Sequence, residues 1–379
     1  MTSEYVLTNA RIVLEDRVLH GSVQVSDGKI ADISERATRA GEDIEGDYLL
    51  PGLVELHTDH LETHFSPRPG LKWNPLAAIQ AHDTQIAGSG ITTVLDCLRM
   101  GSGEDGGFAR GEMRDLASWI ETAGHEDRLR AEHLLHLRCE VSTSDVVEQF
   151  SDFDGDPAVR LVSLMDHAPG QRQFQTMDQY IFYYKVKRGL SDEAFAAFVE
   201  RRIEASNRYS APHRDALASR CAERGITLAS HDDATLDHVE ESIGHGVRLA
   251  EFPTSIAAAE ASHAAGLSVL MGAPNVVRGQ SHSGNIAASD LARLGVLDVL
   301  SSDYVPFSLL HAPFILADEI ETVSLPAAIA MVTATPAATI GLSDRGRIAT
   351  GLRADMVRVR RETGVPVCRA VWREGRRVA

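Results

Sequence analysis

The segment LVELHTDH, residues 53–60, contains the pattern that decides the fold of this chain. It begins as an apolar strand and carries His57 and Asp59 where that strand would end. Seven more apolar runs follow, and helical stretches separate several of them, which is the alternation that builds a parallel sheet. The eight runs are LVELH (53–57), ITTVLD (91–96), LLHLRCEV (134–141), VRLVSLMD (159–166), ITLASH (226–231), VRLAEF (247–252), LSVLMG (267–272) and LDVLSSD (297–303). Because eight strands are the number in a closed barrel, we predict an α/β fold with a (β/α)8 TIM-like barrel over residues 51–345.

The two ends of the chain resemble each other and differ from the middle. Residues 1–50 hold short strand-like runs, and Asp27-Gly28 is a hairpin signal before the run at 29–33. Residues 346–379 show the same strand-and-turn pattern. We predict that 1–50 and 346–379 form one composite β-sandwich domain, the alternative being two unrelated β appendages.

A loop and then a helix are expected between the fourth and fifth runs. Residues 168–190 are rich in Gln, Tyr and Lys and are predicted to form a loop over the barrel mouth. Ser191 is placed to cap a helix, and Gly225 stands where its C-terminal cap belongs.

Composition and charge exclude several classes of protein. The chain of 379 residues carries a net charge of −17, which disfavours nucleic acid or an anionic membrane as its main partner. No apolar stretch reaches the ~18 residues of a membrane helix, and the first residues lack a signal-peptide pattern. The four cysteines form no CxxC pair, which argues against a structural zinc module or a disulfide framework. We expect a cytoplasmic protein with a small-molecule partner, and a homo-oligomer is left open.

Metal-competent side chains stand at the ends of five of the eight runs. In a barrel the carboxyl ends of the strands converge on one face, where catalytic groups are found. A single histidine there is more often structural, but six such residues are hard to attribute to chance. Imidazole with carboxylate suits Zn²⁺, Mn²⁺ or Fe²⁺ better than Ca²⁺, so we predict one or two divalent ions, with Zn²⁺ preferred. The predicted metal ligands are His57, Asp59, Glu140, His167, His231 and Asp303.

Individual roles follow from side-chain chemistry. Glu140 is able to bridge two metals ~3.5–4 Å apart, and Asp303 is predicted to act as general base on a metal-bound water. His60 and His64 would share one face of a helical turn and are expected to line the mouth, with metal binding as the alternative. Their spacing does not match HExxH, so a zincin-type protease is excluded. The residues predicted to support the ligands are His60, Asp166, Asp232 and Glu251.

The seventh run leads into MGAPNVVRGQSHSGN, residues 271–285, which is rich in glycine. Such a loop can offer backbone N–H groups and a cation to phosphate oxygens, although it is not a Walker A motif and a simple turn is the alternative. The Arg and Lys side chains of this segment and of neighbouring segments would supply a local positive field for an anionic substrate, or would simply be solvated. The predicted substrate-binding residues are Arg68, Lys72, Lys185, Asn275, Arg278 and His282.

Long blocks of the chain resemble one known family along nearly its entire length. They are LLPGLVELHTDHLETHFSPRPGLKW, HLRCEV, LVSLMDHAPGQRQF, LASHDDAT, EFPTS, VLMGAPNVVRGQSHSGN and LSSDY. The family is that of the α-D-ribose 1-methylphosphonate 5-triphosphate diphosphatases of the carbon–phosphorus lyase pathway, within the amidohydrolase superfamily. The GLRADMV segment near the C-terminus also resembles the composite β-sandwich of amidohydrolases.

This resemblance implies a barrel of the metal-dependent amidohydrolase type. It also implies hydrolysis of a ribose 5-triphosphate bearing a 1-phosphonate to the 5-phosphate and pyrophosphate, in organic phosphonate catabolism. The chain has His57-Thr58-Asp59 where most amidohydrolases have HxH, and His60 where the family commonly shows Asn. The usual bridging Lys of strand four is missing, so Glu140 is offered for that role. The alternatives are C–N bond hydrolysis of a phosphorylated or cyclic amide, and a scaffold without catalysis.

Overall fold

The computed structural model describes residues 4–38, 40–68, 70–101, 111–172, 180–181, 185, 190–280 and 286–379. The chain divides into two compact units. Unit 1 comprises Met1–Asp96, Ser118–Leu134 and Met271–Ala379, and unit 2 comprises Cys97–Ala117 and Leu135–Leu270. The domain boundaries expected after residue 50 and before residue 346 stay a prediction.

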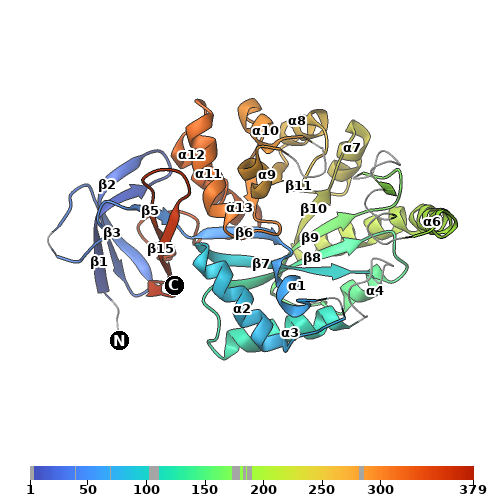
Figure 1. The fold of residues 1–379 in the computed structure, drawn as a ribbon, viewed down its shortest axis with the longest axis horizontal. Coiled ribbons are helices and arrows are strands. Elements are labelled where there is room, and N and C mark those ends of the chain that lie inside the picture. The colour runs from blue at the N-terminus through green and yellow to red at the C-terminus, as the bar shows by residue number, and fades with distance from the viewer. Residues whose placement is uncertain are drawn as a thin grey trace. The chain divides into compact units, whose positions relative to one another are not determined.

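Both ends of the chain contribute strands to one sheet in unit 1. Its strand order is β16-β15-β14-β5-β1-β2-β3, and β4 pairs with β1. In the antiparallel β5–β14 pair, Leu50 stands opposite Val357, so the N-terminal and C-terminal strands are hydrogen-bonded neighbours in one sheet. Figure 1 shows both termini at this sheet. The expected joining of the two chain ends is therefore confirmed. The strands are β1 (Glu4–Val13), β2 (Val18–Ser26), β3 (Lys29–Ser34), β4 (Glu42–Asp43), β5 (Tyr48–Pro51), β14 (Met356–Arg360), β15 (Val367–Arg373) and β16 (Arg376–Arg377).

Two local features explain how the N-terminal strands run. Asp27 and Gly28 have φ values of 51° and 76°, which is the left-handed pair of a type I′ hairpin turn. The first strand, β1, runs without a break, but its pairing with β2 shifts between Leu7 and Ala10. Asn9, at φ 55°, lies at that shift, which is a β-bulge within one strand.

The second sheet is the predicted eight-stranded parallel barrel, with the order β13-β12-β11-β10-β9-β8-β7-β6. Within unit 1, a parallel bridge between Thr58 and Asp303 joins the end of β6 to the residues after β13. All eight apolar runs became strands. They are β6 (Leu53–Thr58), β7 (Ile91–Met100), β8 (Glu132–Glu140), β9 (Val159–Met165), β10 (Thr227–His231), β11 (Leu249–Glu251), β12 (Ser268–Gly272) and β13 (Val299–Ser301).

Helices alternate with the barrel strands. Ser191 caps α6 by accepting a hydrogen bond from the Ala194 N–H, and Gly225 ends the helix in the left-handed region, as the sequence predicts. The glycine-rich segment differs from expectation, because its first half forms α9 instead of a loop. The helices are α1 (His60–Phe65), α2 (Pro75–Gly88), α3 (Glu112–His125), α4 (Val146–Ser151), α6 (Asp192–Arg224), α7 (Leu236–Gly244), α8 (Ile256–Ala264), α9 (Ala273–Arg278), α10 (Ala288–Leu294), α11 (Ser308–Glu319), α12 (Leu325–Ala330) and α13 (Ala334–Thr339).

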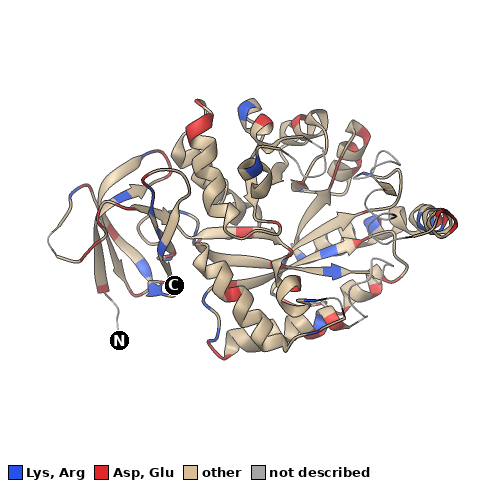
Figure 2. Ribbon diagram, in the orientation of Figure 1, with Lys and Arg blue, Asp and Glu red and all other residues tan. Residues whose placement is uncertain are grey.

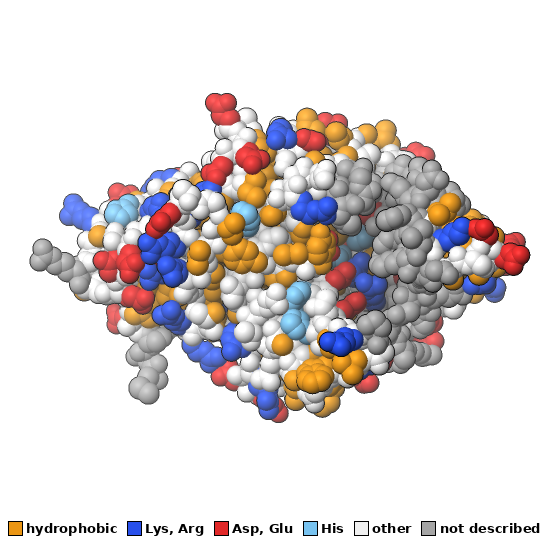
Figure 3. All heavy atoms as spheres, viewed as in Figure 1, with side chains coloured by type: hydrophobic (Ala, Val, Ile, Leu, Met, Phe, Trp, Pro, Cys, Tyr) orange, Lys and Arg blue, Asp and Glu red, His pale blue; other side chains and the backbone are white. Residues whose placement is uncertain are grey.

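Charged side chains of both signs are interspersed on the face of the molecule that the figures show. Figure 2 shows acidic and basic residues together on α6, and Figure 3 shows them interspersed over the sheet of the chain ends. On that sheet, Arg358 pairs with Asp47 at 2.6 Å and Arg360 with Glu362 at 2.7 Å. Among the helices of the described residues, none is long and apolar enough to cross a membrane.

Candidate metal centre

Two histidines of unit 2 and one aspartate lie around a common point. His231 is the last residue of β10, and His167 follows β9 by two residues. Asp232 Oδ2 lies 3.4 Å from His231 Nε2 and 4.0 Å from His167 Nε2. This oxygen is buried and has no hydrogen-bond partner among the described residues. A buried carboxylate oxygen left without a partner is costly, so the arrangement suits a cation.

A carboxylate contacts the second ring nitrogen, Nδ1, of each of these two histidines. Glu140 Oε2 lies 2.6 Å from His167 Nδ1, and Glu251 Oε2 lies 3.1 Å from His231 Nδ1. Each carboxylate favours the tautomer that carries its proton on Nδ1, which leaves a lone pair on Nε2. Both lone pairs then belong to the atoms nearest Asp232 Oδ2. Carboxylate–histidine pairs of this kind are typical of metal ligands.

Glu140 is firmly held in its charged form. Its Oε1 accepts hydrogen bonds from Ser142 Oγ at 2.5 Å and from the His167 N–H at 3.1 Å. Burial by itself would raise the pKa of Glu140, but His167, Arg202 and the hydrogen bonds outweigh it and lower the pKa to about 2. Burial likewise opposes protonation of His167, yet Glu140 raises its pKa overall. Direct binding of metal by Glu140 stays a prediction, since its observed partner is His167.

Asp166 anchors the long helix α6 to the end of β9. Its Oδ2 accepts from Ser210 Oγ at 2.7 Å and from Ser206 Oγ at 2.9 Å, and Arg214 Nη2 lies 3.3 Å away. Its Oδ1 accepts from the Ala168 N–H. These four contacts give Asp166 a supporting position next to His167.

In unit 1, the backbone holds His57, Asp59 and Asp303 together. The Asp303 N–H donates to the His57 carbonyl at 3.0 Å, and the Asp59 N–H donates to the Asp303 carbonyl at 2.9 Å. Asp303 adopts φ 53°, a left-handed conformation that is uncommon for a non-glycine residue. Asp59 is the N-cap of α1, so the strand ends at Thr58. His57 therefore belongs to β6, whereas Asp59 lies just beyond the strand.

Glu55 is a buried carboxylate that ties β6 to the segment after β13. Its two oxygens accept hydrogen bonds from the His57 N–H and the Ser302 N–H, both at 2.6 Å. The side chain is fully buried, and burial raises the pKa of Glu55 to about 7 in spite of these bonds. Sequence reasoning missed this residue, although a Glu inside the apolar run LVELH was the available signal.

His60 lies against another histidine. It is 7% exposed, and its Nδ1 is 3.3 Å from His82 Nδ1 on α2. Burial first, and then His82 and His64, lower the pKa of His60 to about 4. The ring is therefore neutral at physiological pH. His82 was not singled out from the sequence.

The predicted substrate-binding residues differ in their surroundings. Asn275 ties α9 to the backbone at the start of α10, since its Nδ2 donates to the Ile286 carbonyl and its Oδ1 accepts from the Ala288 N–H. Arg278 is exposed in the last turn of α9, and Arg68 and Lys72 are exposed after α1. Lys185 forms an ion pair with Asp192, and His282 lies outside the described residues.

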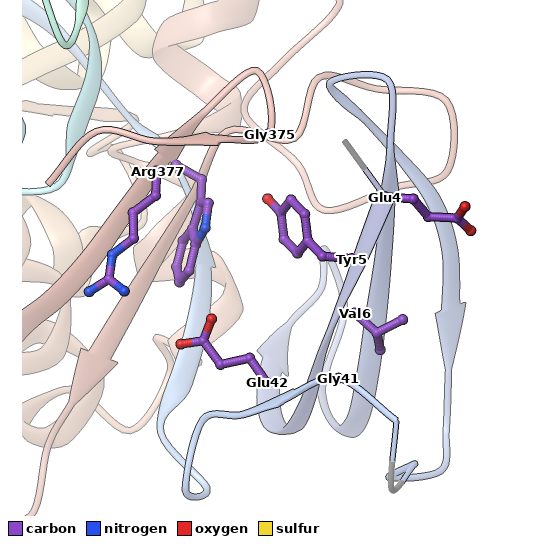
Figure 4. Close-up of a pocket in the computed structure, with 8 residues that line it drawn as sticks. Glu4, Tyr5, Val6, Gly41, Glu42, Gly375 and Arg377 are labelled. Carbon is purple, nitrogen blue, oxygen red and sulfur yellow. The ribbon is translucent and has the colours of Figure 1, made fainter. Parts of the chain in front are cut away.

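A separate pocket opens in the sheet of the chain ends. It has a volume of about 540 Å³, and its lining includes Tyr5, Glu42, Trp372 and Arg377. Figure 4 shows Tyr5 and Glu42 facing into it. The lining contains no histidine, so this pocket lacks the donor set found around Asp232.

Comparisons with known proteins agree with this architecture. The sequence model of the amidohydrolase family matches residues 184–379. The α-D-ribose 1-methylphosphonate 5-triphosphate diphosphatase of Escherichia coli is 46% identical over 98% of this chain and 100% of its own length. N-isopropylammelide isopropylaminohydrolase from Burkholderia multivorans has a similar structure, with a TM-score of 0.64, 16% identity, and coverage of 99% and 98% of the two chains. N-acetyl-D-glucosamine-6-phosphate deacetylase from Mycobacterium smegmatis gives a TM-score of 0.64 at 15% identity, covering 99% of each chain. The similarity of these two structures concerns the fold alone.

Proposed function

Since this chain belongs to the amidohydrolase family and to its α-D-ribose 1-methylphosphonate 5-triphosphate diphosphatases, we propose that it removes pyrophosphate from that ribose triphosphate. The products are the 5-phosphate and pyrophosphate, and the reaction belongs to organic phosphonate catabolism. The observation that carries this function is the identity to the Escherichia coli enzyme over essentially the full length of both chains. The protein is therefore a hydrolase of phosphorus-containing anhydrides.

We propose His167, His231 and Asp232 as ligands of a divalent cation, so Asp232, which the sequence placed among the supporting residues, is now proposed as a ligand. Their support is the pair of Nε2 atoms beside an oxygen that has no hydrogen-bond partner among the described residues. Mixed imidazole and carboxylate ligands favour Zn²⁺, with Mn²⁺ or Fe²⁺ as alternatives. A bound cation would activate water at neutral pH and neutralise charge on the phosphoryl oxygens.

The surrounding carboxylates position these ligands. Glu251 and Glu140 fix the tautomers of His231 and His167, so the donor atoms are oriented before any cation arrives. Direct ligation by Glu140 remains the alternative role. Asp166 holds α6 through two serines and thereby fixes the backbone next to His167.

We keep His57 and Asp59 as further proposed metal ligands and Asp303 as the proposed general base. All three belong to the segment where β6 and the residues after β13 exchange backbone hydrogen bonds. Asp303 would accept the proton of the attacking water, which requires a carboxylate that is charged at neutral pH. Its left-handed backbone is the kind of local strain that clusters at functional sites.

For the substrate, we propose that Arg278 contacts the triphosphate. It is exposed at the end of α9, and its guanidinium could donate to phosphate oxygens in a bidentate manner. Arg68, Lys72, Lys185 and His282 remain proposed contacts of the same kind. Asn275 would act indirectly, because both ends of its amide already bond to the backbone of Ile286 and Ala288. A cytoplasmic location is retained as a proposal from the sequence.

The test is a product assay combined with metal analysis. The purified protein should release pyrophosphate from α-D-ribose 1-methylphosphonate 5-triphosphate, and His231→Ala should lose both bound metal and turnover. The matched control is His245→Ala, which removes a histidine that pairs with Asp215 elsewhere in unit 2. Release of inorganic phosphate alone would contradict the diphosphatase reaction. Full metal content in His231→Ala would contradict the ligand assignment.

A further inference from the structure

Three histidines of unit 1 gather where α1 packs on α2, two helices that lie together in Figure 1. His60 and His64 lie one turn apart on α1, and His82 faces them from α2. One ring nitrogen from each lies within 4.8 Å of the others. This cluster contains none of the ligands proposed above.

The tautomer of His82 can be assigned from its partners. Asp96 Oδ1 lies 2.8 Å from His82 Nε2, and Asp96 Oδ2 lies 2.7 Å from His133 Nδ1. The two histidines keep the Asp96 carboxylate charged, so His82 donates its proton from Nε2. Its bare Nδ1 then points at His60 Nδ1, 3.3 Å away. A histidine oriented by a carboxylate in this way is typical of a metal ligand.

A hydrogen bond between His60 and His82 would explain the short distance between those two rings, but it would not explain the position of His64. The ring of His64 lies edge-on to His60, with centroids 4.8 Å apart. Its Nε2 is buried and has no hydrogen-bond partner in the described part of the chain. A buried ring nitrogen without a partner is unfavourable, and a cation among the three rings would satisfy it.

We propose that His60, His64 and His82 form a second divalent-cation site, with Zn²⁺ as its ion. At Zn–N distances of about 2.0–2.1 Å, two ligands of a tetrahedral ion lie roughly 3.3–3.4 Å apart, which matches the His60–His82 separation. His64 would close the site by moving about 1.5 Å or less. Three imidazoles suit Zn²⁺ and disfavour Mg²⁺ or Ca²⁺, which prefer oxygen ligands.

The position of the site suggests what the ion does. α1 begins directly after Asp59, its N-cap, so an ion bound to two residues of α1 would brace the segment that carries Asp59. The residues behind Asp96 help to fix the His82 ring. His133 contacts both Asp96 and Asp83, and Asp83 in turn accepts a hydrogen bond from the Ala131 N–H at 2.9 Å. The ion would be structural and would tie α1 to α2.

The experiment counts zinc in the full-length protein after chelation, reconstitution and removal of free metal. His64→Ala and His60→Asn should each lose one equivalent relative to wild type, whereas His245→Ala should lose none. The same loss should appear in the His231→Ala background, which separates this site from the ligands proposed around Asp232. Circular dichroism checks that each variant is folded, and the milder His60→Asn serves if His64→Ala does not fold.

A crystal structure of the zinc-loaded protein gives a second readout. An anomalous peak at the zinc edge should lie about 2.0–2.1 Å from His60 Nδ1 and His82 Nδ1. If His60→Asn keeps the wild-type zinc content, or if no anomalous peak lies among the three rings, the cluster is only a histidine hydrogen-bond network and the proposal is wrong.

Discussion

Glu251→Gln should weaken metal binding without changing the shape of the site. Glu251 is fully buried, and its Oε2 bonds His231 Nδ1 at 3.1 Å and accepts from Ser163 Oγ at 2.6 Å. Glutamine has nearly the same volume and keeps an oxygen acceptor. It lacks the negative charge that fixes the His231 tautomer and makes the imidazole a stronger donor.

The size of the effect follows from the kind of hydrogen bond that is lost. A hydrogen bond to a charged group contributes about 1.5–3 kcal/mol, and a neutral one about 0.5–1.5 kcal/mol. The difference of roughly 1–1.5 kcal/mol corresponds to about a tenfold loss of metal affinity. Orienting partners of metal-bound histidines contribute between 10- and 100-fold, so about tenfold is the lower expectation.

Competition for Zn²⁺ with a chromophoric chelator measures this affinity directly, and kcat/KM should fall in parallel when the metal is limiting. Ser163→Ala is the matched control, because it removes a neutral donor from the same carboxylate and leaves the charge in place. Its affinity loss should be smaller than that of Glu251→Gln. Equal losses in the two variants, or wild-type affinity in Glu251→Gln, would refute the argument.

Four further outcomes are expected. Asp303→Asn should lower kcat by ~10²–10⁴-fold with little change in KM, as measured by pyrophosphate release at full metal loading. Arg278→Ala should raise KM for the triphosphate by roughly tenfold or more, since a charge-assisted contact contributes about 1.5–3 kcal/mol. Asp166→Ala should destabilise the protein by about 3–5 kcal/mol in urea unfolding, because it leaves the buried Arg214 without this carboxylate. The free energy of unfolding should also decrease at alkaline pH as His133 deprotonates, and this decrease should be smaller in His133→Gln.

The direction of the last effect follows from the pKa of His133. Burial opposes protonation, but Asp96 and Asp83 outweigh it and raise the pKa to about 9. A folded-state pKa above the ordinary value of 6.5 gives stability that is complete below about pH 6.5 and lost as the pH rises through about 9. Unfolding free energies at pH 6, 8 and 10 measure it, and an identical decline in His133→Gln would contradict the assignment.

Each of the other variants has an outcome that would count against it. A near-normal kcat in Asp303→Asn removes that residue from proton transfer, and a loss of stability alone makes its role structural. An unchanged KM in Arg278→Ala removes Arg278 from the proposed contacts with the triphosphate. For Asp166, the loss should be smaller in Asp166→Asn, which can still accept from the serines of α6, and a loss as large as that of Asp166→Ala would contradict this role.

Most of the fold could be predicted because its signals are local. Apolar runs of strand length, separated by helices, predicted the barrel strands within a few residues at their ends. Ser191 and Gly225 marked the ends of α6 through capping chemistry, which also depends only on nearby residues. The prediction failed where local context was ambiguous, as at residues 273–278, where a Gly-Ala-Pro start allowed a helix that composition alone suggested was a loop.

The sequence by itself also determined which residue types stand at the strand ends, because strand period and barrel topology fix where each strand stops. Only the tertiary structure decided which atom of each of these side chains is left to bind a metal ion. His167 and Glu140 are 27 residues apart, and His231 and Glu251 are 20 apart, so their pairing depends on strand register. The same holds for His60 and His82, which are 22 residues apart and meet only because α1 packs on α2. A histidine's donor atom is set by the partner of its other nitrogen, and that partner is chosen by packing across the sheet or between helices.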